Sequence, residues 1–178
     1  MAYGFNNETV AESTNSKQFN AGITANVTLE SITFESPRKD GTGDKVLIFT
    51  FRGPEGEVYR HIEWDVQDGD EKKLENMAKR IKHILTKFIP EEQAVLHGNT
   101  YEEFANGVIN LLGKNNVGKS VAIKLVYNDK NNLQFTKYLG FIAKEAKDLS
   151  ISKTEKVNKV TAAPTDMDAV SGTDDLPF

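Results

Sequence analysis

The chain has 178 residues, of which 38% are hydrophobic and 27% charged, with 22 Lys and Arg against 26 Asp and Glu. This length suits one domain with a core and a tail better than two full domains. The absence of cysteine excludes disulfides, thiol nucleophiles and cysteine-bound zinc, and no apolar run approaches the ~20 residues that a membrane span needs.

The net charge of -4 is unevenly distributed along the chain. Residues 166–178 contain four Asp and no Lys or Arg, so acidic and basic residues balance in the rest of the chain. Residues 104–160 contain ten Lys and only four acidic residues. A basic region beside an acidic tail is compatible with nucleic-acid binding, although the overall charge is negative.

Residues 1–20 are rich in Asn, Ser, Thr and Glu and show no apolar periodicity, so we expect a flexible N-terminal arm. The arm lacks the basic start and the apolar stretch of a secretory signal. We therefore expect a cytoplasmic protein.

The first strands are indicated by β-branched residues and alternation. Residues 23–34 predict a strand that ends at the turn sequence SPRKDGTGD, and residues 46–51 and 58–66 predict a β-hairpin around Gly53-Pro54-Glu55-Gly56. The even spacing of Val58, Ile62 and Val66 assigns these side chains to the core face. Tyr59 and His61 are then expected on the opposite face.

Two helices are predicted between the early and the late strands. After Asp68 and Glu71 the apolar period changes to 3.6, and Pro90 ends the first helix. Thr100 and Glu103 form a second capping pair, and Gly113 is expected to end the second helix.

Residues 120–127 and 133–142 flank the turn NDKNN and predict a second hairpin. The element order is that of a five-stranded OB-type β-barrel with its helices between strands 3 and 4. Another small α+β domain with the same element order is the alternative. We assign the OB-type domain to residues 21–147 and a disordered acidic tail to residues 148–178.

The chain ends in Asp174, Asp175, Leu176, Pro177 and Phe178. Pro limits the conformations to be ordered, Phe can fill an apolar pocket, and the carboxylates can meet Lys or Arg at its rim. This end is suited to docking a partner protein reversibly. The alternative is that an acidic tail only keeps the chain soluble.

DDLPF resembles the acidic tip of bacterial and phage single-stranded-DNA-binding proteins, which end in several aspartates followed by Ile-Pro-Phe or Leu-Pro-Phe. The resemblance implies an OB fold that binds single strands and a tip, here residues 174–178, that recruits replication, recombination and repair proteins. The body contains no run that aligns with the bacterial protein, and the helical insertion is long. These departures favour a divergent phage member, with oligomerisation left open.

Binding of single strands without sequence preference needs cations along the phosphates and aromatic rings on which bases stack. Both residue types are interleaved on the two predicted hairpins. Lys124 lies one position away from the apolar face of its strand and is expected to contact phosphate. Trp64 reaches the outer face only if a bulge turns the strand. The candidate DNA-binding residues are Arg52, Tyr59, Arg60, Trp64, Lys119, Lys124, Lys137 and Tyr138.

Residues 113–120, GKNNVGKS, match the pattern of a phosphate-binding loop. That loop needs a strand before it and a helix after it, whereas here a predicted helix precedes and a strand follows. The three histidines are not at metal-ligand spacing. We therefore expect no enzyme activity, no cofactor and no metal. A nucleotide-binding protein, or an OB-fold adaptor without DNA binding, remains the alternative to a single-stranded-DNA-binding protein.

Overall fold

The computed structural model describes residues 17–67, 69–137 and 139–158. The fold is mainly β, with a helical insertion between the third and fourth strands, as predicted. The strands form one antiparallel sheet of six strands, where five were predicted. The strands are β1 (Gly22–Glu35), β2 (Val46–Arg52), β3 (Val58–Glu63), β4 (Ser120–Tyr127), β5 (Leu133–Phe135) and β6 (Ile142–Ala143). The helices are α2 (Glu71–Leu85) and α3 (Tyr101–Asn116), with short 3-10 turns η1 (Glu91–Gln93) and η2 (Ala146–Asp148).

The strand order is β3-β2-β1-β4-β5, and β6 pairs with β4. The sheet is open, with β3 and β5 at its two ends. Side chains connect these ends: the Phe135 N–H donates to the Tyr59 hydroxyl at 3.1 Å, and the two rings lie edge to face at 5.0 Å. The last predicted strand, residues 133–142, is divided into β5 and β6.

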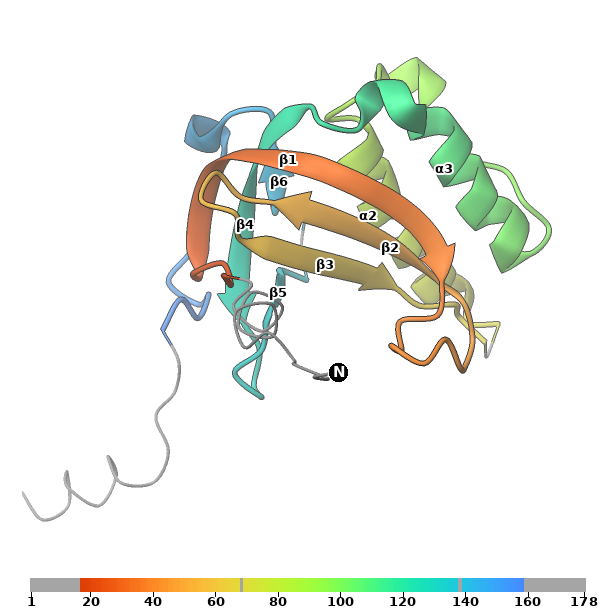
Figure 1. The fold of residues 1–178 in the computed structure, drawn as a ribbon, viewed down its shortest axis with the longest axis horizontal. Helices are drawn as coiled ribbons and strands as arrows, with labels where there is room; N and C mark the ends of the chain where they lie inside the picture. Colours follow the sequence, from red (N-terminus) through yellow and green to blue (C-terminus); the bar gives the residue numbers. More distant parts are fainter. Residues whose placement is uncertain (1–16, 68, 138, 159–178) are drawn as a thin grey trace, which may run out of the picture.

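β1 is long and bent because its register shifts twice, between Thr24 and Val27 and again between Leu29 and Ser31. Such bulges increase twist and turn a strand. The first half of β1 pairs with β4 and the second half with β2, so the strand curves across the sheet from one group of strands to the other (Figure 1).

The core lies between the concave face of the sheet and the two helices, which sit together on one side of it (Figure 1). Apolar residues spaced three or four apart on α2 and α3 meet alternate residues of β1, β2 and β4. The largest fully buried side chains include Phe49, Phe51, Phe141, Ile81, Ile84, Leu85 and Leu112.

The helix ends follow the sequence signals with one shift. The N-cap of α2 is Asp70, whose carboxylate accepts from the backbone N–H groups of Lys72 and Lys73. The predicted cap, Asp68, lies outside the described residues. Thr100 caps α3 by accepting from the Glu103 N–H, as predicted. Gly113, with φ of 52°, interrupts α3 one turn before its end.

The folded part extends past the predicted boundaries on both sides. Phe19 is buried, and the Val58 N–H donates to the Lys17 carbonyl. On the other side Leu149 is buried, and the Tyr127 N–H donates to the Lys156 carbonyl. Residues 149–158 thus form a strap against β4, a segment that composition alone assigned to the disordered tail. Among the described residues no helix has the length and apolar character to cross a membrane.

Candidate nucleic-acid interface

The two faces of β3 are the reverse of those predicted. Tyr59 and His61 point inward, where both rings contact Phe135, while Arg60 on the other face is exposed. Glu63, which shares the inward face, is only 2% exposed. The expected outward position of the Tyr59 ring is therefore wrong: it packs against β5, and burial raises the pKa of its hydroxyl.

The outer face of β3 carries Arg60, Ile62 and, immediately after the strand, Trp64. Trp64 is 59% exposed, the most exposed large hydrophobic side chain among the described residues. No bulge is needed, because Trp64 continues the alternation of Arg60 and Ile62. A cation and an indole thus lie along one strand on the face away from the helices, and these are the two residue types that a single strand needs.

Arg52, at the end of β2, belongs to the same outer face. Its register partners are Thr28 on β1 and Val58 on β3. The Arg52 guanidinium donates to Glu30 at 2.6 Å, with the two side chains 45% and 39% exposed. An exposed pair of this kind contributes little to stability, so a phosphate can replace Glu30 at low cost.

The β1–β2 loop forms a basic hollow of about 570 Å³. Four of its lining residues are cationic and one, Glu35, is acidic. The cations are Arg38, Lys39, Lys45 and Arg60. Arg60 reaches this hollow from the middle of β3, so the loop and the outer face form one surface.

The loop is braced by its own side chains. The Asp40 carboxylate accepts from the backbone N–H and the hydroxyl of Thr42, and these hydrogen bonds lower the pKa of Asp40. Ser36 donates to the Thr42 carbonyl and accepts from the Arg38 N–H. Gly41, with φ of 75°, turns the chain between them. The backbone that carries Arg38 and Lys39 is therefore ordered before any ligand arrives.

A second hollow, of about 680 Å³, lies at the other end of β3. Lys17 and Arg60 contribute cations, Tyr127 an aromatic ring, and Asn131 and Asn132 the amides of the β4–β5 turn. No acidic residue lines it. Since Arg60 lines both hollows, the two are joined by one guanidinium.

These cations are not neutralised within the described part of the chain. None of the five cations that line the two basic hollows forms an ion pair with another described residue. The five are Lys17, Arg38, Lys39, Lys45 and Arg60. Their charges are available to a polyanion.

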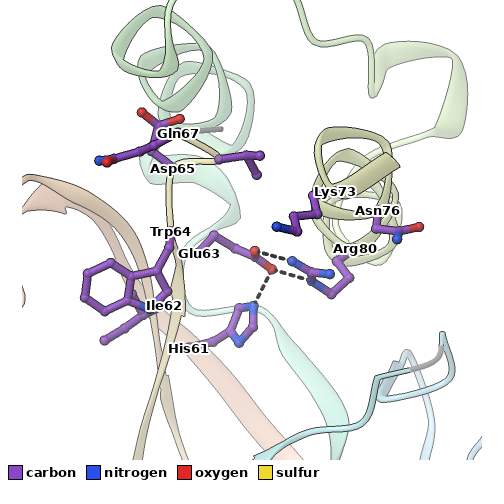
Figure 2. A pocket seen from close by; sticks show the side chains of 10 residues that line it. His61, Ile62, Glu63, Trp64, Asp65, Gln67, Lys73, Asn76 and Arg80 are labelled. Atoms are coloured by element: carbon purple, nitrogen blue, oxygen red, sulfur yellow. Dashed lines mark hydrogen bonds and ion pairs between the residues drawn. The ribbon is translucent and has the colours of Figure 1, made fainter. Parts of the chain in front are cut away.

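A third hollow, of about 510 Å³, lies between the end of β3 and α2 (Figure 2). Trp64 lies on one side of the strand, and Lys73, Asn76 and Arg80 of α2 lie across from it. Asp65 and Gln67, from the segment that joins β3 to α2, line the end of the hollow. The hollow is polar, and the exposed Trp64 ring lies on the opposite side of the strand from α2.

The floor of this hollow is fixed by a buried carboxylate. Arg80 donates two hydrogen bonds to Glu63, at 2.9 and 2.8 Å, and His61 Nε2 donates a third at 2.8 Å. Burial by itself raises the pKa of Glu63, but the hydrogen bonds from Arg80 and His61 outweigh it and hold the pKa below its usual value. The Tyr101 hydroxyl donates to the Glu63 carbonyl and accepts from the Leu47 N–H. These hydrogen bonds connect α3 to β3 and β2.

Lys124 is not at the surface. Its side chain is buried beneath the strap, where the ammonium donates to Glu155 at 2.8 Å and to the Ser150 carbonyl at 2.7 Å. The expectation that Lys124 contacts phosphate is therefore corrected: this cation holds residues 149–158 against β4. Alternation misplaced it because both faces of β4 are covered.

Two of the remaining predicted residues, Lys119 and Lys137, line neither basic hollow. Lys119 is exposed after α3 and donates to the Asn116 side chain at 2.8 Å. Lys137 is exposed after β5, beside the strap. Tyr138 and the tip residues Asp174, Asp175, Leu176, Pro177 and Phe178 lie outside the described residues.

The segment that matches a phosphate-binding loop runs from the last turn of α3 into β4. A helix precedes it and a strand follows, in the order that the sequence predicted and opposite to the order such a loop needs. Its Ser120 begins β4. Among the described residues, no group of three His, Asp or Glu side chains is placed to hold a metal ion.

Sequence reasoning missed Lys17, Arg38, Lys39 and Lys45. The sequence SPRKDGTGDK was interpreted only as a turn, although its three cations within ten residues are a local signal of anion binding. Lys17 gave no such signal, because only the fold brings it to Arg60.

Comparison of the chain with protein-family models gives no match, and comparison with curated proteins gives no relative.

Proposed function

We propose that this protein binds single-stranded DNA across the outer face of β1, β2 and β3. The observation that carries the proposal is that Arg60 joins two basic hollows on the face that also presents Trp64. Cations along a groove would hold the phosphates, and the indole would stack on a base. Coating the strand in this way would protect unpaired DNA during replication, recombination and repair, in the cytoplasm of the cell or of a phage host.

We further propose that the fold is an OB-type barrel whose last seam is closed by side chains. The strand order and the position of the helices are compatible with a five-stranded barrel. Contacts of Tyr59 and His61 with Phe135 bring the ends of the sheet together. In OB folds the face of strands 2 and 3 and the adjoining loops bind oligonucleotides. The basic hollows beside β3, the β1–β2 loop and the β4–β5 turn support the proposal.

The C-terminal residues 174–178 are proposed to dock replication, recombination or repair proteins. The two carboxylates and the apolar Leu-Pro-Phe end suit an apolar pocket with a basic rim on the partner protein. Removing these five residues is expected to leave the affinity for oligo-dT undiminished. The same removal should abolish partner retention on DNA-coated beads, and retention that survives it would contradict the proposal.

Replacement of Arg60 tests the DNA-binding proposal. Arg60→Ala is expected to weaken oligo-dT binding about tenfold, because a charge-assisted hydrogen bond to phosphate is lost. Lys147→Ala is the control, because Lys147 is an exposed cation that pairs with Glu145 and lines neither basic hollow. Binding is measured by fluorescence anisotropy of labelled oligo-dT. Equal affinity of the two variants for oligo-dT would contradict the proposed surface. If the unaltered protein does not bind oligo-dT, the result would favour a protein adaptor without DNA binding.

A further inference from the structure

β3 is an end strand of the sheet, and only one of its two edges pairs with β2. In an antiparallel pair, residues that exchange hydrogen bonds with the neighbouring strand alternate with residues whose N–H and C=O groups face away from it. The Val58 N–H donates to the Lys17 carbonyl and not to β2, so Val58 faces away. Arg60 and Ile62 follow in the same register at even spacing, and their backbone groups therefore face the open edge as well.

The outward backbone groups of Arg60 and Ile62 have no hydrogen-bond partner in residues 17–67, 69–137 and 139–158. Each of the two residues presents one donor and one acceptor. An unpaired stretch of strand edge is the place at which an extended peptide adds to a sheet through main-chain hydrogen bonds. The fold therefore leaves room for one more strand beside β3.

The third hollow lies along this open edge. Its lining includes the consecutive residues 61–67. Successive side chains of a strand point to opposite faces, so a hollow that consecutive residues line follows the edge of the backbone between the two faces. Figure 2 shows Ile62 and Trp64 on one side of the strand, and His61 and Glu63 on the other side, toward α2. The hollow is thus a groove along the edge of β3, with Trp64 on one side and α2 on the other.

The charges that line this groove balance. Glu63 and Asp65 are acidic, and Lys73 and Arg80 are basic. Arg80 donates two hydrogen bonds to Glu63. Lys73 lies 3.9 Å from the Asp70 carboxylate. A balanced lining attracts a polyanion weakly, whereas the main chain of a peptide is neutral and matches unpaired N–H and C=O groups. The groove therefore favours an extended peptide over a nucleic acid.

We propose that the open edge of β3 binds an extended segment of a partner protein, which adds to the sheet as a further strand. The side chains of this segment alternate between the two sides of the groove. Those on one side meet Ile62 and Trp64 and are apolar, and those on the other side meet Asn76 of α2 and are polar. A single extended segment fits between Trp64 and α2, where the edge of a second folded sheet would meet the helix. This inference does not rest on DNA binding.

Amide hydrogen exchange of the full chain tests the site. The probe is a pool of peptides of about six residues, a usual strand length, in which Val, Ile or Phe alternates with Thr, Ser, Gln or Asn. A pool of the same composition with its apolar residues grouped at one end is the control. The tightest-binding alternating peptide, at about 100 times its Kd, is expected to slow exchange of the Ile62 amide about a hundredfold. The His61 amide, which faces β2, should change little.

Two substitutions at one position test the main-chain hydrogen bond. Ile62→Pro removes the outward N–H without removing a donor to β2, and proline is tolerated on edge strands. Ile62→Val keeps the N–H and is the matched control. We expect Ile62→Pro to bind the selected peptide about fivefold more weakly than Ile62→Val, as for one lost hydrogen bond. Equal affinities would overturn the proposal.

N-methylated peptides keep the test independent of the folding of Ile62→Pro. An added strand uses one of its own edges, so methylation of alternate peptide nitrogens should abolish binding in one phase and leave it unchanged in the other. Equal effects of the two phases, or no binding by any alternating peptide, would overturn the proposal. Slower exchange of the Ile62 amide with oligo-dT but not with peptide would assign the edge to nucleic acid. Protection that rises with protein concentration alone would assign it to a second copy of the chain, and either result overturns the proposal.

Discussion

At the level of single residues, His83 couples the folded state to pH. Its Nε2 accepts from the Gly140 N–H at 3.2 Å, and its ring lies edge to face on Phe141 at 5.1 Å. Burial, together with the nearby Lys87 ammonium, lowers the pKa of His83 to about 4. Protonation would remove the acceptor that Gly140 uses, so the fold favours the neutral ring.

The depressed pKa makes stability depend on pH between about 6.5 and 4. In this window the unfolded chain binds more protons at His83, so the free energy of unfolding falls as the pH falls. Because the ring is half exposed, we expect a loss of only about 1 kcal/mol from pH 7 to pH 5. Urea denaturation of the unaltered protein and of His83→Gln, at pH 7 and at pH 5, measures this loss. An equal loss in the variant would contradict the assignment.

Lys124 and Glu155 make a second prediction at the residue level. Glu155→Ala would leave a buried ammonium without its carboxylate, and breaking a buried pair costs about 3 kcal/mol. Lys153→Ala, on the same strap but exposed, is the control and should be nearly neutral. Chemical denaturation measures both. The affinity of Glu155→Ala for oligo-dT should be unchanged, and a rise larger than that of the control would return Lys124 to the DNA-binding surface, because its freed ammonium would then meet phosphate.

At the level of elements, the seam between β3 and β5 depends on Tyr59. Tyr59→Phe keeps the ring contact with Phe135 but removes the hydroxyl that accepts from the backbone N–H of Phe135. We therefore expect the free energy of unfolding to fall by about 1 kcal/mol. Tyr59→Leu also removes the aromatic contacts and should cost more. If thermal or urea unfolding shows no difference between Tyr59→Phe and the unaltered protein, the hydroxyl does not hold the seam.

The elements themselves could be predicted, because apolar periods of two and of 3.6 differ over a few turns. The faces of β3 could not. Val58, Ile62 and Val66 gave a core pattern, yet Glu63 occupies the interior because Arg80, 17 positions later, neutralises it. Lys124 was misplaced for the same reason, since its partner Glu155 lies 31 positions away. Local alternation contains no information about such distant ion pairs.

At the level of the whole molecule, charge is separated within one chain. The five cations of the two basic hollows lie on the described domain, whereas the last 13 residues contribute four Asp and no cation. Sequence composition revealed the imbalance but not the surface, since only the fold brings Lys17 and the β1–β2 loop to the two hollows that Arg60 shares. The formal charge of -4 therefore says little about which ligand the domain favours.

The most direct test is the affinity of the full chain for oligo-dT, measured with matched duplex DNA across a salt series. If the five cations each meet a phosphate, the logarithm of the association constant should fall with the logarithm of salt concentration with a slope of about -3.5. The Trp64 fluorescence should be quenched by the single strand and not by the duplex. Equal affinity for both forms, or no binding detectable by anisotropy, would contradict a single-strand-binding surface on β1, β2 and β3.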